Sequence, residues 1–217
     1  MFKLAIFDLD GTLLDTLTDL AVSCNYALDG FGFDEHEPER YKDFIGRGVT
    51  NLIKSALPEH SRDDATVAAV KFRFMEHYRE HSQDLTRPYD GIPDMLCVVR
   101  SAGIKTAVVS NKPHENAVSM SAVYFPGLLD IVFGQRDGIP IKPNPTVVFR
   151  IMEHFGVTAE ETIYIGDSGV DMQTGRAAGI FTVGVSWGFR PKDELRENGA
   201  DIIIDKVSLL KKIIVDK

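Results

Sequence analysis

The chain has 217 residues, of which 44% are hydrophobic and 26% charged, and its net charge is −8. These values are typical of a soluble globular protein, and no apolar run approaches the roughly 18 residues of a membrane span. The acidic balance argues against a nucleic-acid or anionic-membrane partner, because affinity for phosphate backbones depends on clustered Lys and Arg. The first residues lack the pattern of a signal peptide, so we expect a cytoplasmic protein. Cys24 and Cys97 lack metal-ligand spacing and are predicted to be buried, reduced thiols.

Six short β-branched or apolar runs, each bounded by Gly, Asp, Asn or Ser, predict buried strands. They span residues 4–8, 106–109, 130–133, 162–165, 181–185 and 201–204. Helical patterns lie between them, at residues 93–102, 113–123, 145–155 and 169–178. Alternating strands and helices of these lengths predict a doubly wound, Rossmann-like α/β domain with a parallel sheet.

One stretch departs from this alternation. From about residue 17 to residue 87 no strand pattern is convincing, and apolar residues recur at helical spacing. We therefore predict an α/β core of residues 1–14 and 88–217, and an all-helical domain of residues 15–87 inserted after the first strand. Ligands of open α/β sheets bind outside the carboxyl ends of the strands, so the inserted domain is expected to form a cap over the site.

The first predicted strand ends in two carboxylates, Asp8 and Asp10, separated by one residue. Side chains at positions i and i+2 share a face while a strand continues, so both are expected to reach one site. Two acids that close suit a divalent cation and a division of labour between a nucleophile and a proton donor. Asp is also a common turn former and helix cap, so this pair alone does not establish a function.

Two further clusters also follow predicted strands. The segment Ser110-Asn111-Lys112 comes directly after the second strand, where a hydroxyl and backbone N–H groups at a strand-to-helix turn form a phosphate cradle. The Ser or the Asn could instead cap the following helix. Lys142 precedes two prolines that stiffen its backbone, and a rigidly placed ammonium can offset charge on a phosphoryl group. A surface lysine in a turn is the alternative.

The fourth cluster contains Asp167, at the end of the strand 162–165, and Asp171, four residues further on. Carboxylates at this spacing can converge on one cation, as they do in magnesium sites. Capping of the helix 169–178 is the alternative, and it loses weight beside the other three clusters.

Together the clusters resemble, in the same order, the four motifs of the haloacid dehalogenase superfamily, in the phosphatase branch that contains phosphoglycolate phosphatases. They read Asp8-x-Asp10-Gly11-Thr12, Ser110, Lys142 and Gly166-Asp167-Ser168-x-x-Asp171. The resemblance implies magnesium-dependent hydrolysis of a small phosphomonoester. Asp8 would become an aspartyl-phosphate, and Asp10 would act as acid and then as base.

The resemblance also implies which residues bind the metal and the phosphoryl group. The expected Mg²⁺ ligands are the carboxylates of Asp8 and Asp167, the main-chain carbonyl of Asp10 and, in support, Asp171. The expected phosphoryl ligands are Ser110, the N–H of Asn111 and Lys142. An acid at position 10 favours phosphomonoester hydrolysis, because relatives that cleave carbon–phosphorus or carbon–halogen bonds lack it.

Substrate choice is expected to depend on the cap, where Gly46-Arg47-Gly48 is the most informative segment. Two glycines let the backbone approach a ligand while the guanidinium faces a carboxylate or phosphate. The segment is similar to the one that phosphoglycolate phosphatases carry there, although a turn with a solvated Arg would look the same. Phosphoglycolate is the first substrate prediction, with pyrophosphate, nucleotides and sugar phosphates as alternatives. Either a monomer or a homodimer is compatible with the sequence.

Two rival functions remain, beside that of a degenerate phosphatase relative that only binds its ligand. A sugar-phosphate mutase of the same superfamily, similar to β-phosphoglucomutase, would use the same carboxylates, although the Gly-Arg-Gly segment favours hydrolysis. A receiver-like signalling domain would also be doubly wound, but its phosphorylated Asp follows a middle strand, where this chain has Ser110.

Overall fold

The computed structural model describes residues 1–216, which form two compact units. Residues 1–14 and those from 88 onward make up the first unit, and residues 15–87 make up the second. A two-stranded sheet of β2 (Leu14–Asp15) and β3 (Arg87–Pro88) contains both points at which the chain passes from one unit to the other. Within the described residues, no helix is long and apolar enough to cross a membrane.

The first unit is built on a six-stranded sheet with the order β5-β4-β1-β6-β7-β8, in which every neighbouring pair is parallel. The strands are β1 (Leu4–Phe7), β4 (Lys105–Pro113), β5 (Ile131–Gln135), β6 (Thr162–Gly166), β7 (Phe181–Val185) and β8 (Ile202–Ile204). They agree with the six predicted runs to within two residues, except that β4 continues to Pro113. The predicted doubly wound α/β fold is confirmed.

The strand order reverses around β1. The chain runs from β1 to β4 and β5 on one side of the sheet, and then to β6, β7 and β8 on the other. The carboxyl ends of β1, β4 and β6 are therefore neighbours at the position where doubly wound folds bind their ligands.

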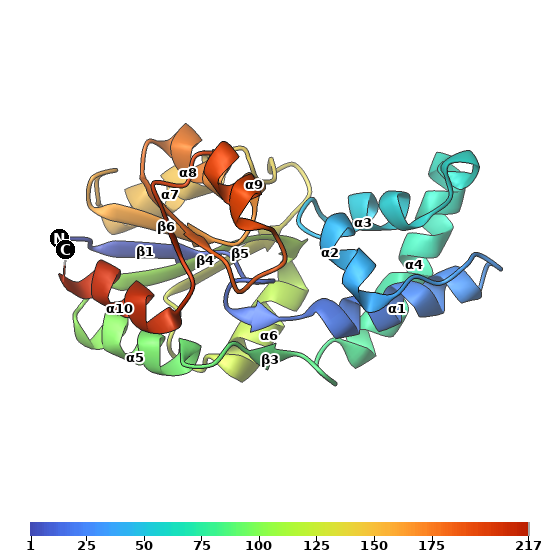
Figure 1. The fold of residues 1–217 in the computed structure, drawn as a ribbon, viewed down its shortest axis with the longest axis horizontal. Helices are drawn as coiled ribbons and strands as arrows, with labels where there is room; N and C mark the ends of the chain where they lie inside the picture. Colours follow the sequence, from blue (N-terminus) through green and yellow to red (C-terminus); the bar gives the residue numbers. More distant parts are fainter. Residues whose placement is uncertain (217) are drawn as a thin grey trace. The chain divides into compact units, whose positions relative to one another are not determined.

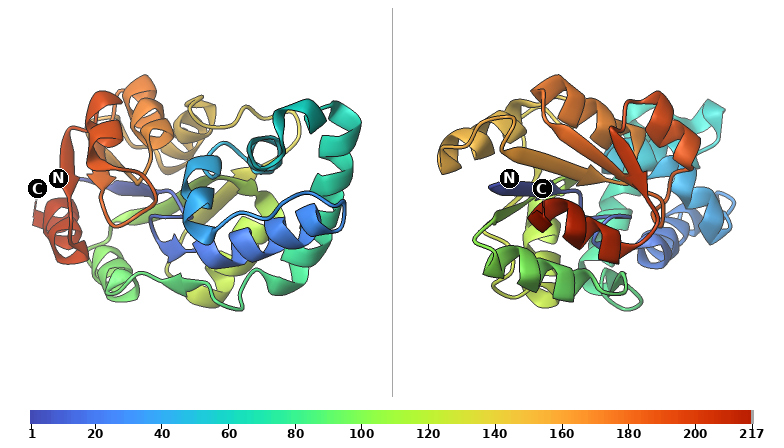
Figure 2. Two further views of the ribbon diagram at one scale, coloured as in Figure 1. Left: turned by 45° about the vertical axis from the view of Figure 1, so that its right-hand side comes forward. Right: turned by 60° about the vertical axis from the view of Figure 1, so that its left-hand side comes forward.

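Helices cover both faces of this sheet (Figure 1). One face carries α7 (Thr146–Phe155), α8 (Gly169–Ala178) and α9 (Lys192–Glu197), and the other carries α5 (Ile92–Ser101), α6 (His114–Tyr124) and α10 (Val207–Asp216). In the right-hand view of Figure 2, the orange α8 and the green α5 lie on opposite sides of the strands.

Burial on both faces explains why the central strands β1, β6 and β7 have sequences that are mostly apolar. Along β1, Ala5 and Phe7 pack in the same core as Leu96 of α5, whereas Leu4 and Ile6 pack in the core that contains residues of α7. Alternate side chains of one strand thus enter two separate cores.

One cysteine prediction is wrong. Cys97 is exposed, while Cys24 is buried, and both are free thiols. Helix α5 buries Ile92, Met95 and Leu96 together with Val99, so its core-facing stripe passes beside position 97. Single apolar positions on an amphipathic helix are assigned to a face only once the helix rotation is known.

The second unit is helical. Its helices are α1 (Leu17–Asp29), α2 (Tyr41–Phe44), α3 (Val49–Ala56) and α4 (Asp64–His81), with 3₁₀ turns at Pro38–Arg40 and Glu59–Ser61. Helices α1 and α4 pack against each other. The N-terminus of α4 is capped by Asp63, whose carboxylate accepts a hydrogen bond from the backbone N–H of Thr66.

Candidate active site

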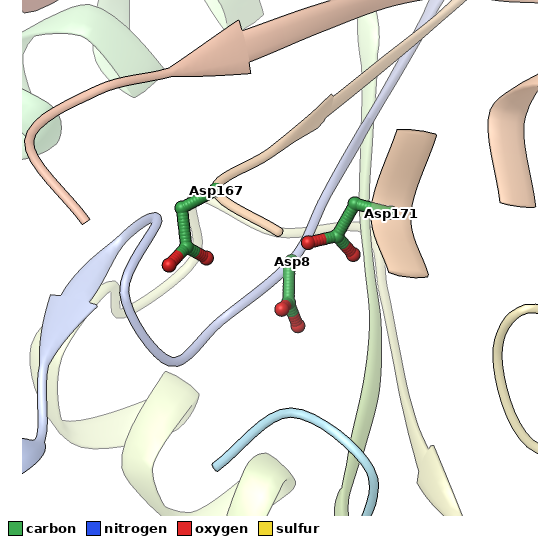
Figure 3. Close-up of side chains that lie close together, drawn as sticks. All are labelled: Asp8, Asp167 and Asp171. Atoms are coloured by element: carbon green, nitrogen blue, oxygen red, sulfur yellow. The ribbon is translucent and has the colours of Figure 1, made fainter. Parts of the chain in front are cut away.

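Three buried carboxylates meet at the carboxyl ends of β1 and β6 (Figure 3). Asp8 directly follows β1, Asp167 directly follows β6, and Asp171 lies in the first turn of α8. Each side chain offers an oxygen atom within 4.8 Å of the other two. Three negative charges at this separation repel one another, so the cluster requires protons or cations.

Lys142 supplies one positive charge to this cluster. Its Nζ lies 2.9 Å from Asp8 Oδ1 and 2.7 Å from Asp171 Oδ1, and its side chain is 3% exposed. Burial alone would lower the pKa of Lys142, but the attraction of Asp171 and Asp8 raises it well above its ordinary value. The ammonium therefore stays charged. The loop before α7 places Lys142 beside Asp8 and Asp171.

One ammonium does not neutralise three carboxylates. Burial and the nearby charge of Asp171 raise the pKa of Asp8 to about 7, although Lys142 opposes the shift. Burial, with Asp171 and Asp8, also raises the pKa of Asp167 well above its ordinary value. A divalent cation would remove this repulsion, and a set of carboxylate oxygens suits a hard cation. The cluster therefore fits a metal ion.

Hydrogen bonds fix the orientation of the two C-terminal members of the cluster. Thr12 Oγ1 donates to Asp167 Oδ1 at 3.0 Å, and the N–H of Phe189 donates to Asp167 Oδ2 at 2.8 Å. Ser168 donates to Asp171 Oδ2 from both its backbone N–H, at 3.1 Å, and its Oγ, at 2.6 Å. Asp171 is thus part of the capping box of α8 and a member of the acidic cluster at the same time.

Close packing at Asp167 also explains the glycine of the first motif. Gly11 has a φ of +80°, and a Cβ at this position would lie 2.2 Å from Asp167 Oδ2. Any side chain would displace the carboxylate, so the tight approach of this loop to Asp167 requires glycine.

Asp10 is not one of the three clustered carboxylates and pairs with Lys112, although its charge is among those that raise the pKa of Asp8. Lys112 Nζ is 3.0 Å from Asp10 Oδ1 and 3.3 Å from Oδ2, and the two side chains are 2% and 12% exposed. The predicted placement of Asp8 and Asp10 on one strand face is wrong, because β1 ends at Phe7 and Asp10 forms an isolated bridge with Leu14. Lys112 belongs to the second predicted cluster, but no role in the site was predicted for it.

The second motif lies in a strand and not in the predicted strand-to-helix turn. Strand β4 continues through Ser110 and Asn111 because its pairing register with β5 shifts after Val109. Ser110 is buried, and its Oγ accepts a hydrogen bond from the N–H of Lys112 at 3.3 Å. Neither Ser110 nor Asn111 caps α6, whose N-cap residue is Pro113.

The Asn111 side chain holds the backbone of Lys142. Its Nδ2 donates to the Lys142 carbonyl at 3.1 Å, and its Oδ1 accepts from the Lys142 N–H at 2.9 Å. This reciprocal pair joins β4 to the loop that carries the ammonium. The second and third motifs are therefore connected directly, and the predicted phosphate contact of the Asn111 N–H stays a prediction.

The predicted substrate segment belongs to the second unit, between α2 and α3. Gly46 and Gly48 have φ angles of +109° and +81°, which residues with side chains rarely adopt. Arg47, between them, is exposed. The positive φ angles explain why both positions are glycine. The role of Arg47 in substrate binding stays a prediction.

Comparison with known proteins agrees with this geometry. The profile of the family described as haloacid dehalogenase-like hydrolase matches residues 5–185. A phosphoglycolate phosphatase of Aquifex aeolicus is 32% identical over 188 residues, covering 86% of each chain. An N-acetylmuramic acid 6-phosphate phosphatase of Pseudomonas aeruginosa is 30% identical over 212 residues, covering 94% of this chain and 90% of the relative.

Solved structures show the same fold. A protein of Lactobacillus delbrueckii subsp. bulgaricus superposes with a TM-score of 0.94 at 34% identity, covering 100% of this chain and 99% of the other. A haloacid dehalogenase-like family hydrolase of Streptococcus pneumoniae shares the fold, with a TM-score of 0.86 at 20% identity over 96% of each chain. The chain therefore belongs to the haloacid dehalogenase-like hydrolases and is a phosphatase of that family.

Proposed function

We propose that this phosphatase is a magnesium-dependent phosphomonoester hydrolase that uses Asp8 as its nucleophile, with phosphoglycolate as its first candidate substrate. The observation that carries the proposal is the buried cluster of Asp8, Asp167 and Asp171 with Lys142 among them. In this setting the Asp8 carboxylate is suited to attack a phosphoryl group, because Lys142 and a metal ion bound by the carboxylates would hold that group in place.

Mg²⁺ is the cation that we assign to this cluster. The proposed ligands are the carboxylates of Asp8 and Asp167, with Asp171 in support, and the main-chain carbonyl of Asp10. When bound, Mg²⁺ supplies positive charge that offsets the charge of the phosphoryl oxygens.

The residues of the chain perform the chemistry in two half-reactions. In the first, an Asp8 oxygen forms a bond to phosphorus while the bond to the leaving oxygen breaks, and Asp10 gives that oxygen a proton. In the second, water attacks the phosphorus of the aspartyl-phosphate and Asp10 takes its proton. The bond from phosphorus to Asp8 then breaks, which releases phosphate and restores the carboxylate.

Three residues are proposed to bind the phosphoryl oxygens. The Lys142 ammonium already lies 2.9 Å from Asp8 Oδ1, so a phosphoryl group that reaches Asp8 meets this charge. Ser110 would donate from its buried hydroxyl and Asn111 from its backbone N–H. These contacts are expected to strengthen as negative charge builds on the oxygens in the transition state.

Substrate selection is proposed to lie in the helical unit of residues 15–87, acting as a cap. Phosphoglycolate carries a carboxylate in addition to its phosphate, and the exposed guanidinium of Arg47 between two glycines suits such a group. The similarity to phosphoglycolate phosphatases supports this choice, while the similarity to a phosphatase of an amino-sugar phosphate makes that class the second candidate. A cytoplasmic location and a monomeric or homodimeric state remain predictions.

The test is phosphate release from a panel of substrates, with Mg²⁺ and with excess EDTA. The panel contains phosphoglycolate, N-acetylmuramic acid 6-phosphate, hexose phosphates, nucleoside monophosphates and pyrophosphate. We expect Mg²⁺-dependent release that is fastest with phosphoglycolate. Release that EDTA leaves unchanged would overturn the metal assignment, and conversion of a hexose phosphate to its isomer without net phosphate release would favour a mutase.

A further inference from the structure

Lys112 is the second buried ammonium of the first unit. Its side chain is 2% exposed, and its Nζ contacts both carboxylate oxygens of Asp10, at 3.0 and 3.3 Å. Lys142, in contrast, pairs with Asp8 and Asp171. The structure thus gives the proposed nucleophile and the proposed acid/base each its own lysine.

The backbones of the two partners are held by different contacts. Asp10 lies beyond the end of β1, and its backbone forms an isolated bridge with Leu14. Lys112 lies in the stretch of β4 where the register with β5 shifts, between the ladder pairs at Val109 and Pro113. Pairing with β5 on both sides holds this stretch on the sheet, and the ion pair with Lys112 connects the Asp10 carboxyl group to it.

The spacing of the two oxygens from one ammonium also restricts rotation of the Asp10 carboxyl group. A proton donor works only when its oxygen lies within hydrogen-bond reach of the atom that receives the proton. A displacement of about 1 Å can cost about a hundredfold in rate. The orientation of Asp10 is therefore a quantity on which turnover depends.

From this geometry we infer that Lys112 is a positioning residue, which holds the Asp10 carboxyl group in place for proton transfer to the leaving oxygen. The inference rests on the proposed function, because it takes Asp10 as the acid of the first half-reaction. Lys112 itself neither gives nor takes a proton in this scheme. Its effect should appear only where the reaction needs the acid.

Two substrates separate this role from a general structural one. The leaving oxygen of phosphoglycolate is an alkoxide, which needs a proton as the bond to phosphorus breaks. The leaving group of p-nitrophenyl phosphate is a stable phenolate, which departs without one. The quantity to compare is kcat/KM, which covers the steps through transfer of the phosphoryl group to Asp8.

The variant is Lys112→Met, which keeps most of the apolar stem and removes the ammonium. We expect kcat/KM for phosphoglycolate to fall at least about tenfold, a part of the 10²–10⁴-fold that a general acid contributes. For p-nitrophenyl phosphate we expect a change of about twofold or less. Lys105→Met is the matched control, because Lys105 is 52% exposed in the same strand, and both substrates should react as with the wild-type protein.

A double-mutant cycle tests whether Lys112 acts through Asp10. In Asp10→Asn protein the acid is already absent, so adding Lys112→Met should change kcat/KM for phosphoglycolate by about twofold or less. Circular dichroism of each variant shows whether it is folded. If Lys112→Met does not fold, the same comparison is made with Lys112→Gln.

Equal losses on both substrates, or the same loss in the Asp10→Asn background as in the wild-type background, would overturn the inference. Unchanged turnover of phosphoglycolate by the Lys112 variants would also overturn it. Failure of the proposed function gives a different result, since the wild-type protein would then hydrolyse neither substrate in the presence of Mg²⁺.

Discussion

Replacing Lys142 by Met gives the sharpest stability test of the acidic cluster. The substitution removes an ammonium that lies 2.9 Å from Asp8 and 2.7 Å from Asp171, and all three side chains are almost fully buried. Removing one partner of a buried ion pair typically costs about 3–5 kcal/mol, because the other charge is left uncompensated. For a protein of this size, each kcal/mol corresponds to about 2–4 °C in Tm. We therefore expect the Tm in EDTA at pH 8 to fall by about 6–20 °C.

The loss should depend on pH and on metal. The pKa of Asp8 is about 7, so at pH 5.5 this carboxyl group is mostly protonated and Lys142→Met leaves one fewer unpaired charge. The fall in Tm should then be smaller than at pH 8. Saturating Mg²⁺ at pH 8 should restore part of the loss, because a divalent cation offsets the same carboxylates.

Thermal unfolding followed by circular dichroism measures both effects, with Lys105→Met as control. Lys105 Nζ lies 3.8 Å from Asp130 Oδ1 and is half-exposed, so solvent screens the pair and its loss should cost less than about 1 kcal/mol. A Lys142→Met protein whose Tm in EDTA at pH 8 matches that of Lys105→Met would refute the reasoning.

Three further predictions concern the same cluster. Asp8→Asn should abolish phosphate release while circular dichroism stays native, and undiminished release would contradict the nucleophile assignment. The raised pKa of Asp8 means that the folded protein binds a proton that the unfolded chain has lost, so in EDTA the free energy of unfolding should fall between pH 5 and pH 8. The contribution of Asp8 to this fall is up to about 1.4 kcal/mol per pH unit, so the slope should be less steep in Asp8→Asn. Urea titrations at several pH values measure this slope, and a rising free energy would show that the sign is wrong. Gly11→Ala should displace Asp167 and weaken Mg²⁺ binding, measured by calorimetry, at least about tenfold. The control is Gly103→Ala, which has a similar φ of +78° and open space around it and should leave the affinity unchanged. Equal affinities in the two variants would argue against the contact between residue 11 and Asp167.

The sequence was sufficient to predict the strands of the sheet and to bring the residues of the acidic cluster to one edge of it. Strands β1 and β6 and the first part of β4 are buried on both faces, so they stand out as apolar runs. Asp8 and Asp167 directly follow β1 and β6, and Ser110 follows the apolar run of β4. Parallel strands place their carboxyl ends at one edge. Asp8 and Asp167 could therefore be assigned to the same place without any knowledge of the side-chain geometry.

The contacts made by Lys112 could not be predicted in the same way. Its pairing with Asp10 spans 102 positions and depends on the register shift that carries β4 past Val109. No local periodicity encodes such a shift. The reciprocal hydrogen bonds between Asn111 and Lys142 could not be predicted either, because they depend on how a loop packs against a strand 31 positions away.

The most direct test of the account is the site of covalent phosphorylation. The protein is mixed with phosphoglycolate and Mg²⁺, quenched in acid during turnover, digested, and searched by mass spectrometry for a phosphoryl adduct that hydroxylamine removes. We predict an adduct on Asp8 that is absent from Asp8→Asn protein. Turnover with the phosphoryl group on another residue, or turnover by Asp8→Asn protein with no adduct at all, would contradict the assignment of Asp8 as nucleophile.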